Sequence, residues 1–326
     1  MSTYRALKGY SVKSITSDPA NPNEGQVWYN STAKTIKVQP LISAWSSGGA
    51  MNETRHAGIG FGTATAAVSA GGYNPSTGFL GVSEEYDGSS WTVGNDLGTQ
   101  RYTGTGTGIL TAGLAIGGNF PSGNANLSVE AYDGTSYTEG PNISTGHGYG
   151  WAAGTEAASI IATGLSDPSP VTPTVNVESW DGSSWTEGPN VNAARYGIQG
   201  FGTATAMVIA GGTPGGNGGT EEWNGTAWSE VNNLPAARSD GSGSGILTDG
   251  MVFNGNPGAL TTSLKYDGTN WAAAPSLTVG RGNCNRGLTI GNTRSSIQYA
   301  SGPGAPKMTV TEEYAEAAAT RTVDVS

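Results

Sequence analysis

The chain has 326 residues, a formal net charge of −10 and a sequence pI near 4.6, and only 12% of its residues are charged. An acidic surface repels phosphate backbones, which excludes nucleic acid as an expected partner. The single cysteine, Cys284, cannot form an internal disulfide, and no apolar run suits a signal peptide or a membrane span. We therefore expect synthesis and folding in a reducing cytoplasm, without membrane insertion.

The first 40 residues differ from the rest of the chain. They carry five basic side chains against two acidic ones, whereas the remainder is strongly acidic. The segment TSDPANPNEG is rich in turn residues, and QVWYN-STAK-TIKVQ predicts a β-hairpin. A lone hairpin is only marginally stable in water, so we expect it to dock. Its partner would be the rest of the fold, the C-terminal tail or another protein.

An eight-residue phrase recurs along the chain. It reads EEYDGSSW at 84–91, EAYDGTSY at 130–137, ESWDGSSW at 178–185, EEWNGTAW at 221–228 and LKYDGTNW at 264–271. The last aromatic of each phrase marks one unit, and Trp45 precedes them as a sixth marker. Successive markers are 46, 46, 48, 43 and 43 residues apart, a period typical of four-stranded propeller blades.

The first complete unit predicts four strands. We place them at Gly58–Gly62, Ala66–Gly71, Val82–Tyr86 and Ser90–Val93. Asp87-Gly88 then falls in the hairpin turn between the last two strands, where these residue types are favoured. The flanking aromatic residues are expected to pack between neighbouring blades.

The last unit lacks a copy of the phrase. It begins near Arg286 and supplies GLTIG, SIQYA and TVTEEY but no fourth strand, while the Trp45 segment has no third strand of its own. Pairing Trp45 with Tyr314 would close a six-bladed ring and remove its exposed edges. In the alternative, TRTVDVS at 320–326 supplies the last strand. The expected organisation is an N-terminal docking module (1–40), a six-bladed all-β propeller (41–314) and a C-terminal tail (315–326).

The strand pattern resembles kelch-type β-propellers over residues 45–314. The resemblance depends on Gly-Gly pairs after the second strand, the aromatic ending the third strand and the Trp of the fourth; the pairs are Gly71-Gly72, Gly117-Gly118 and Gly211-Gly212. Three units depart from the pair, with Thr163-Gly164, Asn254-Gly255 and Ser301-Gly302. The resemblance implies a fold and says little about function.

A basic residue stands ten positions after every marker. These residues are Arg55, Arg101, His147, Arg195, Arg238 and Arg281, and they are expected at the mouth of the central channel. A repeated acid occurs two residues before the aromatic of the third strand, at Glu84, Glu130, Glu178, Glu221 and Glu312, with Leu264 as the exception. Two interpretations remain open: structural pairing of each arginine with an acid or a carbonyl, and an anion-binding ring.

The connections between the second and third strands vary in length and sequence. They cover residues 73–81, 119–127, 165–176, 213–219, 256–262 and 303–310. Variable loops on a fixed scaffold are the usual place for recognition. Tyr73, Phe79 and Phe120 are the candidate binding residues; each would stack on a sugar, pack on a protein partner or only bury its own loop.

No pattern of residues indicates catalysis. The phrase differs from the sialidase Asp-box, because its Asp precedes the Trp by four positions and its Gly follows directly. A copper radical site needs two histidine ligands together with two tyrosines and a crosslinked cysteine, whereas the two histidines, His56 and His147, fall in different units. We predict no catalytic residues, no metal site and no cofactor.

The N-terminal segment YRALKGYSVKSITSDPANPNEGQVWYNSTAKTIKVQP, followed by AWSSGG, resembles the start of structural proteins of marine tailed bacteriophages. There an EGQ-x-WYN-type segment precedes a kelch-like propeller. The resemblance implies a non-enzymatic, multi-copy or homo-oligomeric virion protein, on the tail or neck rather than decorating the capsid. Residues 1–40 would bind other virion proteins, and the propeller would bind a host-surface glycan or protein. A carbohydrate-active propeller and a cellular binding propeller remain the alternatives.

Overall fold

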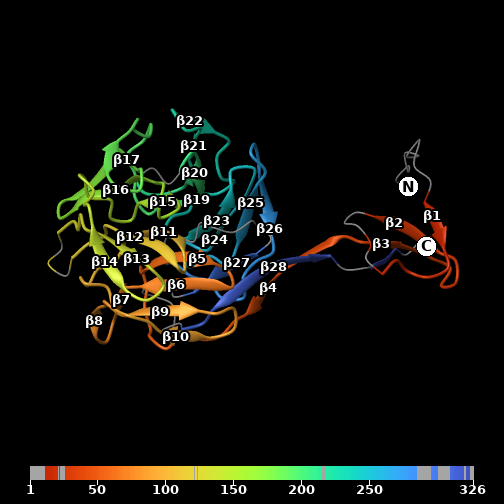
Figure 1. Cartoon of the computed structure of the whole chain (residues 1–326). Helices are drawn as coiled ribbons and strands as arrows, with labels where there is room; N and C mark the ends of the chain where they lie inside the picture. Colours follow the sequence, from red (N-terminus) through yellow and green to blue (C-terminus); the bar gives the residue numbers. More distant parts are fainter. Residues whose placement is uncertain are drawn as a thin grey trace. The chain divides into compact units, whose positions relative to one another are not determined.

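The computed structural model describes residues 12–20, 22, 26–120, 122, 124–214, 218–284, 295–299, 309–318 and 321–323. None of these residues is helical, which confirms the predicted all-β class. The chain divides into two compact units (Figure 1). One contains Met1–Ala44 together with Glu316–Ser326, and the other contains Trp45–Ala315.

The larger unit has a propeller-like architecture of antiparallel sheets. Sheet 1 contains β5 (Ile59–Thr63), β6 (Ala66–Ala70), β9 (Ser83–Tyr86) and β10 (Trp91–Val93), paired in that order. Each end agrees with its predicted position to within one residue. A short two-stranded ribbon, β7 (Tyr73–Asn74) with β8 (Gly78–Phe79), lies in the connection between β6 and β9.

Four further sheets repeat this order. Sheet 2 contains β11 (Thr105–Ile109), β12 (Ala112–Ile116), β13 (Val129–Tyr132) and β14 (Tyr137–Gly140). Sheet 3 contains β15 (Trp151–Gly154), β16 (Ser159–Pro168), β17 (Val171–Trp180) and β18 (Trp185–Glu187). Sheet 4 contains β19 (Gln199–Thr203), β20 (Ala206–Ala210), β21 (Thr220–Trp223) and β22 (Trp228–Val231). Sheet 5 contains β23 (Ser242–Ile246), β24 (Asp249–Phe253), β25 (Ser263–Tyr266) and β26 (Trp271–Ala274).

Sheet 6 combines strands from both ends of the chain. Its order is β27 (Ser295–Gln298), β28 (Glu312–Ala318) and β4 (Leu41–Ser47). The rings of Trp45 and Tyr314 lie 5.3 Å apart, centroid to centroid. The predicted first strand of this unit, GLTIG at 287–291, and Gly302 lie outside the described residues.

The smaller unit contains one sheet, in the order β1 (Lys13–Ile15), β2 (Val27–Asn30), β3 (Thr35–Val38) and β29 (Arg321–Val323). The predicted hairpin is present as β2 and β3, and β29 pairs with β3. The alternative in which residues 320–326 complete the larger unit is therefore wrong. Asp18 holds this sheet by pairing with Lys37 (2.7 Å) and accepting hydrogen bonds from Asn30 and Trp28, which lower the pKa of Asp18 to about 2.

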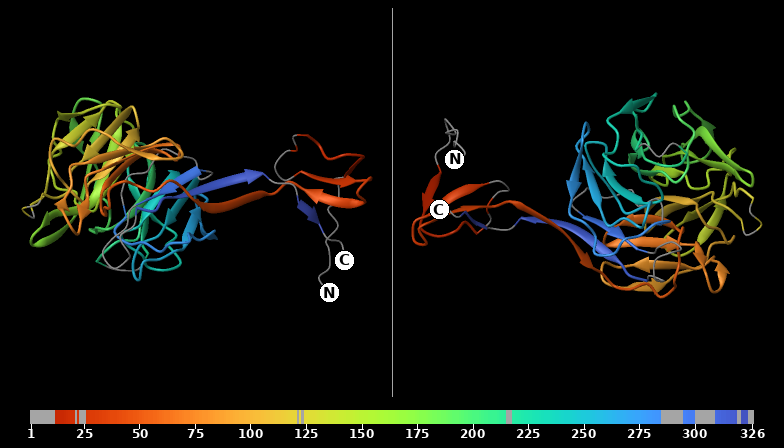
Figure 2. Two further views of the ribbon diagram at one scale, coloured as in Figure 1. Left: turned by 90° about the horizontal axis from the view of Figure 1, so that it is seen from below. Right: turned by 180° about the vertical axis from the view of Figure 1, so that it is seen from behind.

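Sheets 1 to 5 lie around a common centre, with their first strands, β5, β11, β15, β19 and β23, innermost (Figures 1 and 2). Contacts join β5 to β11, β11 to β15, β15 to β19, β19 to β23, and β27 to β5. A hydrogen bond between the hydroxyls of Ser244 and Ser296 joins β23 to β27. Each sheet therefore packs against the next one along the chain, and the last packs against the first.

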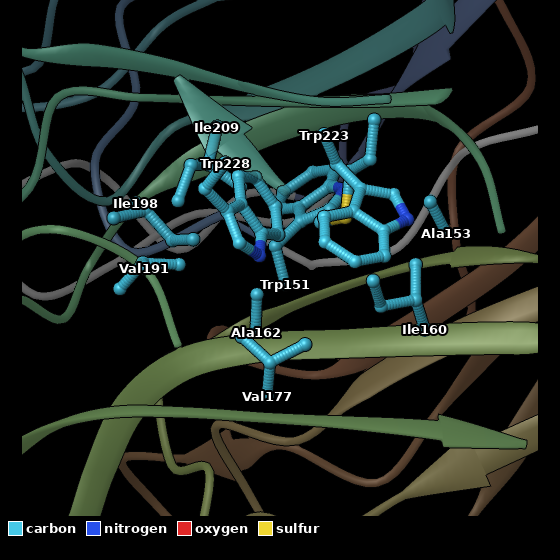
Figure 3. Close-up of a cluster of buried hydrophobic side chains, with 11 residues drawn as sticks. Trp151, Ala153, Ile160, Ala162, Val177, Val191, Ile198, Ile209, Trp223 and Trp228 are labelled. Carbon is cyan, nitrogen blue, oxygen red and sulfur yellow. The ribbon is translucent and has the colours of Figure 1, made fainter. Parts of the chain in front are cut away.

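The core lies between neighbouring sheets. Figure 3 shows the cluster between sheets 3 and 4, where Trp151 and Val177 lie close to Trp223 and Trp228. Trp223 and Trp228 are the two aromatic residues of one repeated phrase, and their rings are 5.5 Å apart. The aromatic residues of the phrase thus pack as the sequence predicts.

Glycines on the inner strands allow the sheets to approach closely. A Cβ atom added to Gly113 would lie 2.3 Å from the ring of Phe61, and one added to Gly250 would lie 2.0 Å from the ring of Phe201. In both cases a phenylalanine on the first strand of one sheet covers a glycine on the second strand of the next. A large side chain on one sheet is matched by the absence of a side chain on its neighbour.

The pair Phe61 and Gly113 gives a test of this packing. Gly113→Ala should destabilise the larger unit by about 1–3 kcal/mol, because the added methyl group overlaps the Phe61 ring. Phe61→Leu introduced into the same chain should recover part of that loss. Gly140→Ala is the control, since its Cβ would meet only the carbonyl of Val129 at 3.7 Å. Denaturant unfolding measures all four chains; a Gly113→Ala chain as stable as the control would contradict the packing.

Candidate functional site

The repeated phrase forms a structural turn between the third and fourth strands. In sheet 1, Oδ1 of Asp87 accepts hydrogen bonds from the backbone N–H groups of Ser89 and Ser90, each at 2.8 Å. The bond from Ser90 contributes most to lowering the pKa of Asp87 to about 2. The next residue, Gly88, has a φ of 92°, which explains why glycine follows the Asp or Asn in every copy. The Asp side chain of the phrase thus stabilises the turn in which it lies.

The opposite side of the larger unit carries the connections between sheets and the connections between second and third strands. We call it the loop face. The repeated basic residues begin here, and all six are at most 5% exposed. Nη1 of Arg55 donates to the carbonyls of Gly71 (2.8 Å) and Val82 (2.6 Å), and Nη2 pairs with Glu84 (3.0 Å). The guanidinium therefore lies between the second and third strands of its own sheet.

The same buried pair recurs in four other units. The pairs are Arg101 with Glu130, His147 with Glu178 (3.4 Å), Arg195 with Glu221 (2.7 Å) and Arg281 with Glu312 (3.0 Å). Each glutamate also accepts a hydrogen bond from a backbone N–H seven positions after the marker that precedes the glutamate in the chain. Glu130, for example, accepts from Gly98 at 2.7 Å, seven positions after Trp91. The remaining four donors are Asn52, Ser144, Asn192 and Thr278. One carboxylate thus holds both an arginine or histidine and the chain that leads into the sheet.

Sheet 5 lacks this pair, and the residues that would contact the missing glutamate are changed as well. Leu264 replaces the glutamate, and Pro235, which has no N–H to offer, stands seven positions after the marker Trp228. Arg238 hydrogen-bonds to the carbonyl (3.3 Å) and hydroxyl (3.0 Å) of Thr262 instead. Burial lowers the pKa of Arg238 to about 10. The backbone N–H donor at position 235 and the carboxylate acceptor at position 264 are therefore both absent, so neither is left without the other.

A second repeated feature lies two residues beyond each of these basic positions. Ala57, Thr103, Tyr149, Gly197, Asp240 and Asn283 all have a φ between 47° and 68°. Five of the six are not glycine, although a left-handed backbone costs such residues about 1–2 kcal/mol. We call these six residues the collar.

The collar residues hydrogen-bond to one another through their backbones. Thr103 N–H donates to Ala57 (2.6 Å), Tyr149 to Thr103 (2.9 Å), Gly197 to Tyr149 (2.9 Å) and Asp240 to Gly197 (2.7 Å). Cys284, next to Asn283, donates to Asp240 (3.0 Å), and Ala57 donates to Asn283 (2.9 Å). The hydrogen bonds therefore return to their starting residue. Sequence reasoning missed the collar, because its residue types share nothing; only their constant distance from the basic position marks them.

Two of the three predicted loop residues meet on the loop face. Tyr73 and Phe79 face each other across the β7–β8 ribbon, with ring centroids 5.2 Å apart. His56 contacts Tyr73 (5.3 Å) and Tyr102 contacts Phe79 (5.0 Å). These four half-buried rings form a continuous group, which we call the aromatic row. Phe120 is also half-buried but belongs to the connection of sheet 2 and makes none of these contacts.

The connection at 165–176 is not an irregular loop. β16 and β17 continue through it as a hairpin that ends at residues 169–170, with register shifts near Gly164 and Asp167. Val171, near its tip, is 57% exposed. The connections of sheets 1 and 3 thus differ in structure as well as in sequence, one being a two-stranded ribbon and the other a long hairpin.

Comparison with known proteins gives no match to a protein-family model, and no curated protein matches the sequence. Among the residues that the structure describes, no group of three or more His, Cys, Asp or Glu side chains is placed to hold a metal ion. The described part of the chain also contains no helix with the length and hydropathy needed to cross a bilayer.

An arginine that pairs with a carboxylate, Arg101, and one that does not, Arg238, give a matched test of the buried ion pairs. Arg101→Met should cost about 3–5 kcal/mol of unfolding free energy, because it leaves the Glu130 carboxylate buried without its cation. Arg238→Met removes a guanidinium that has no carboxylate partner, and should cost about 1 kcal/mol.

Urea unfolding of both variants at pH 7 measures these losses. Equal losses in the two variants would show that the ion pairs do not stabilise the sheets. Loss of binding to an inorganic anion with unchanged stability would favour the anion-ring interpretation.

Proposed function

We propose that this chain is a non-enzymatic structural protein of a tailed-phage particle. In this proposal a six-bladed propeller presents its loop face to the host surface or a partner subunit, and residues 1–40 attach the chain to other virion proteins. A tail or neck position is preferred to capsid decoration. The observation that carries the proposal is the contrast between the two faces: one repeated form of turn on one face, and connections of differing structure, such as the β7–β8 ribbon and the β16–β17 hairpin, on the other.

The hydrogen-bonded collar supports the count of six blades. Each of the six units contributes one left-handed residue to it, and the bonds run from unit to unit before returning to Ala57.

Equivalent contacts of Trp45 and Trp91 support closure by β4. Nε1 of Trp91 donates to the hydroxyl of Thr311 (2.8 Å), directly before strand β28 of sheet 6. Nε1 of Trp45 donates to the hydroxyl of Ser263 (3.3 Å), the corresponding residue of sheet 5, and to the carbonyl of Pro275 (3.0 Å). Trp45 thus makes the contacts of a fourth-strand residue of sheet 6.

The chain termini support the role in attachment. Both ends belong to the same small unit, where β29 pairs with β3. The first and last strands of the larger unit, β4 and β28, are hydrogen-bonded neighbours. The chain therefore enters and leaves the larger unit through two adjacent strands. The resemblance of the N-terminal segment to phage structural proteins is the reason for proposing other virion proteins as its partner.

Closure by β4 predicts a large effect of Trp45→Ala. The variant should lose about 3–5 kcal/mol, because it removes the buried contacts of the indole with Phe253 and Tyr314 as well as its hydrogen bonds. Val93→Ala, at a 67% exposed position of a fourth strand, is the control and should be nearly neutral. Guanidinium unfolding followed by tryptophan fluorescence compares them. A loss below about 1 kcal/mol for Trp45→Ala would rule out closure by this strand.

The role in the particle predicts stoichiometric presence in purified virions, measured by quantitative mass spectrometry. A chain lacking residues 1–40 should remain folded, because the larger unit closes without them, and should be absent from particles. Normal incorporation of the shortened chain would refute the attachment role. Absence of the full-length protein from particles, together with turnover of a glycan, would favour the carbohydrate-active alternative.

A further inference from the structure

We propose that Asn224 is a site of spontaneous modification, at which the folded turn of sheet 4 converts the asparagine to aspartate. Asn224 and Gly225 take the place of the Asp-Gly pair in the phrase EEWNGTAW, whereas the other four copies carry aspartate. The substrate is the side-chain amide of Asn224, the co-reactant is water, and the products are a carboxylate and ammonia. The reaction does not depend on the virion role proposed above.

The side chain of Asn224 is held by the same kinds of donor as the aspartates of the other copies. Its Oδ1 accepts hydrogen bonds from the backbone N–H groups of Thr226 and Ala227, each at 3.0 Å, and from the Thr226 hydroxyl at 2.8 Å. In sheet 1 the three corresponding bonds to Oδ1 of Asp87 are each 2.8 Å. Sheet 4 therefore builds an aspartate turn around a neutral side chain.

These donors stabilise negative charge on the side-chain oxygen. Hydrogen bonds within the turn lower the pKa of the aspartate in all four of the other copies, and bring the pKa of Asp87 and of Asp181 to about 2. Attack on the amide carbon of Asn224 places negative charge on the same oxygen, Oδ1. The donors that favour a carboxylate in four units thus form an oxyanion hole for the reaction in the fifth.

The backbone nitrogen of Gly225 is the attacking group. The hydrogen bond from the Thr226 N–H to Oδ1 closes a ring that contains both Cγ of Asn224 and the Gly225 nitrogen, so the amide is folded toward its own backbone. No residue that the structure describes accepts a hydrogen bond from the Gly225 N–H, and residues 224–227 are exposed to water. Glycine also has no side chain to hinder the approach.

The reaction proceeds through a cyclic imide. Hydroxide removes the amide proton of Gly225, and the nitrogen forms a bond to Cγ of Asn224. The bond from Cγ to Nδ2 breaks, and Nδ2 takes up a proton and leaves as ammonia. Water then adds to Cγ and breaks its bond to the Gly225 nitrogen, which regains a proton. The original backbone is restored, with aspartate at position 224.

The turn favours aspartate over isoaspartate, the product formed when water opens the imide at the backbone carbonyl. Isoaspartate adds a methylene group to the backbone between the paired residues Trp223 and Trp228. Aspartate leaves the backbone unchanged and makes the hydrogen bonds charge-assisted, which strengthens them. The lowered pKa of the turn aspartates also keeps their carboxylates ionised at neutral pH, so they resist the same attack.

Asn254 and Gly255 form a second Asn-Gly pair, which serves as an internal control. Asn254 is fully buried, and within the described part of the chain neither polar atom of its side chain has a hydrogen-bond partner. The Gly255 N–H donates to the carbonyl of Arg281 at 2.7 Å. This pair lacks both the donors to Oδ1 and a free attacking nitrogen, so it should not react. Asn217, in a third pair, lies outside the described residues.

Incubation of the full-length protein at pH 8, followed by peptide mapping, tests the proposal. A glutamyl endopeptidase that cuts after Glu222 and Glu230 releases residues 223–230, which contain Asn224 and neither of the other pairs. We expect this peptide to gain the mass difference between OH and NH2 and to co-elute with the synthetic aspartate peptide. Conversion in the folded protein should be at least threefold faster than in a free synthetic peptide of the same residues. Conversion of Asn254 should be at least tenfold slower than that of Asn224.

Thr226→Val removes the hydroxyl donor to Oδ1, keeps both backbone donors and should slow the conversion at least threefold. Thr226→Ser is the matched control, because serine donates from this position in sheets 1 and 3, and it should convert at the rate of the unmodified chain. Unchanged thermal unfolding of both variants excludes a folding defect. Slower conversion in the folded protein than in the free peptide, isoaspartate as the main product, or equal rates in the two variants would each overturn the proposal.

Discussion

The collar is the constraint on which the larger unit depends. In five of the six units the left-handed residue itself donates its N–H to the carbonyl of the preceding unit. In the sixth the donor is Cys284, next to Asn283, and the bonds return to the first residue. At five of these residues the backbone carries a conformational cost that glycine would avoid. The hydrogen bonds that offset this conformational cost each join two neighbouring units, so a unit forms both of its collar bonds only when both neighbours are folded. We therefore expect the sheets to fold cooperatively.

The residue before the aromatic of each third strand is matched in type to the aromatic residue of the next sheet. Where the third strand carries glutamate before its aromatic residue, the next sheet supplies a tyrosine whose hydroxyl bonds to it; the pairs are Tyr132 with Glu85, Tyr266 with Glu222 and Tyr86 with Glu313. Where that position is Ala131 or Ser179, the next sheet supplies Trp180 or Trp223, whose indole N–H bonds within its own sheet. At these five junctions the aromatic residue of the phrase therefore matches the residue offered by the neighbouring sheet, and at the junction of sheets 5 and 6 Nζ of Lys265 lies 5.8 Å from the centre of the Tyr314 ring. Tyr86 with Glu313 joins sheet 1 to sheet 6 by the same rule.

The features that are local in sequence could be predicted, and those that depend on the neighbouring unit could not. Strand positions, the Asp-Gly turns and the repeated arginines and glutamates all follow from spacing within one unit, and Tyr314 identifies Trp45 as its missing neighbour. The left-handed collar does not follow, because alanine, threonine and tyrosine give no sign of a positive φ. The aromatic row was predicted only in part: Tyr73 and Phe79 stand out in a variable loop, whereas His56 and Tyr102 simply follow repeated arginines.

The same division explains where recognition is possible. The repeated charged groups are used by the scaffold: the aspartates in their turns, the glutamates and arginines within sheets, and further glutamates between sheets. A residue that satisfies a partner in every unit is not free to vary with a ligand. The connections on the loop face lie outside these pairs, so their side chains differ from unit to unit while the repeated pairs are kept. Recognition is therefore expected where the units differ and not where they repeat.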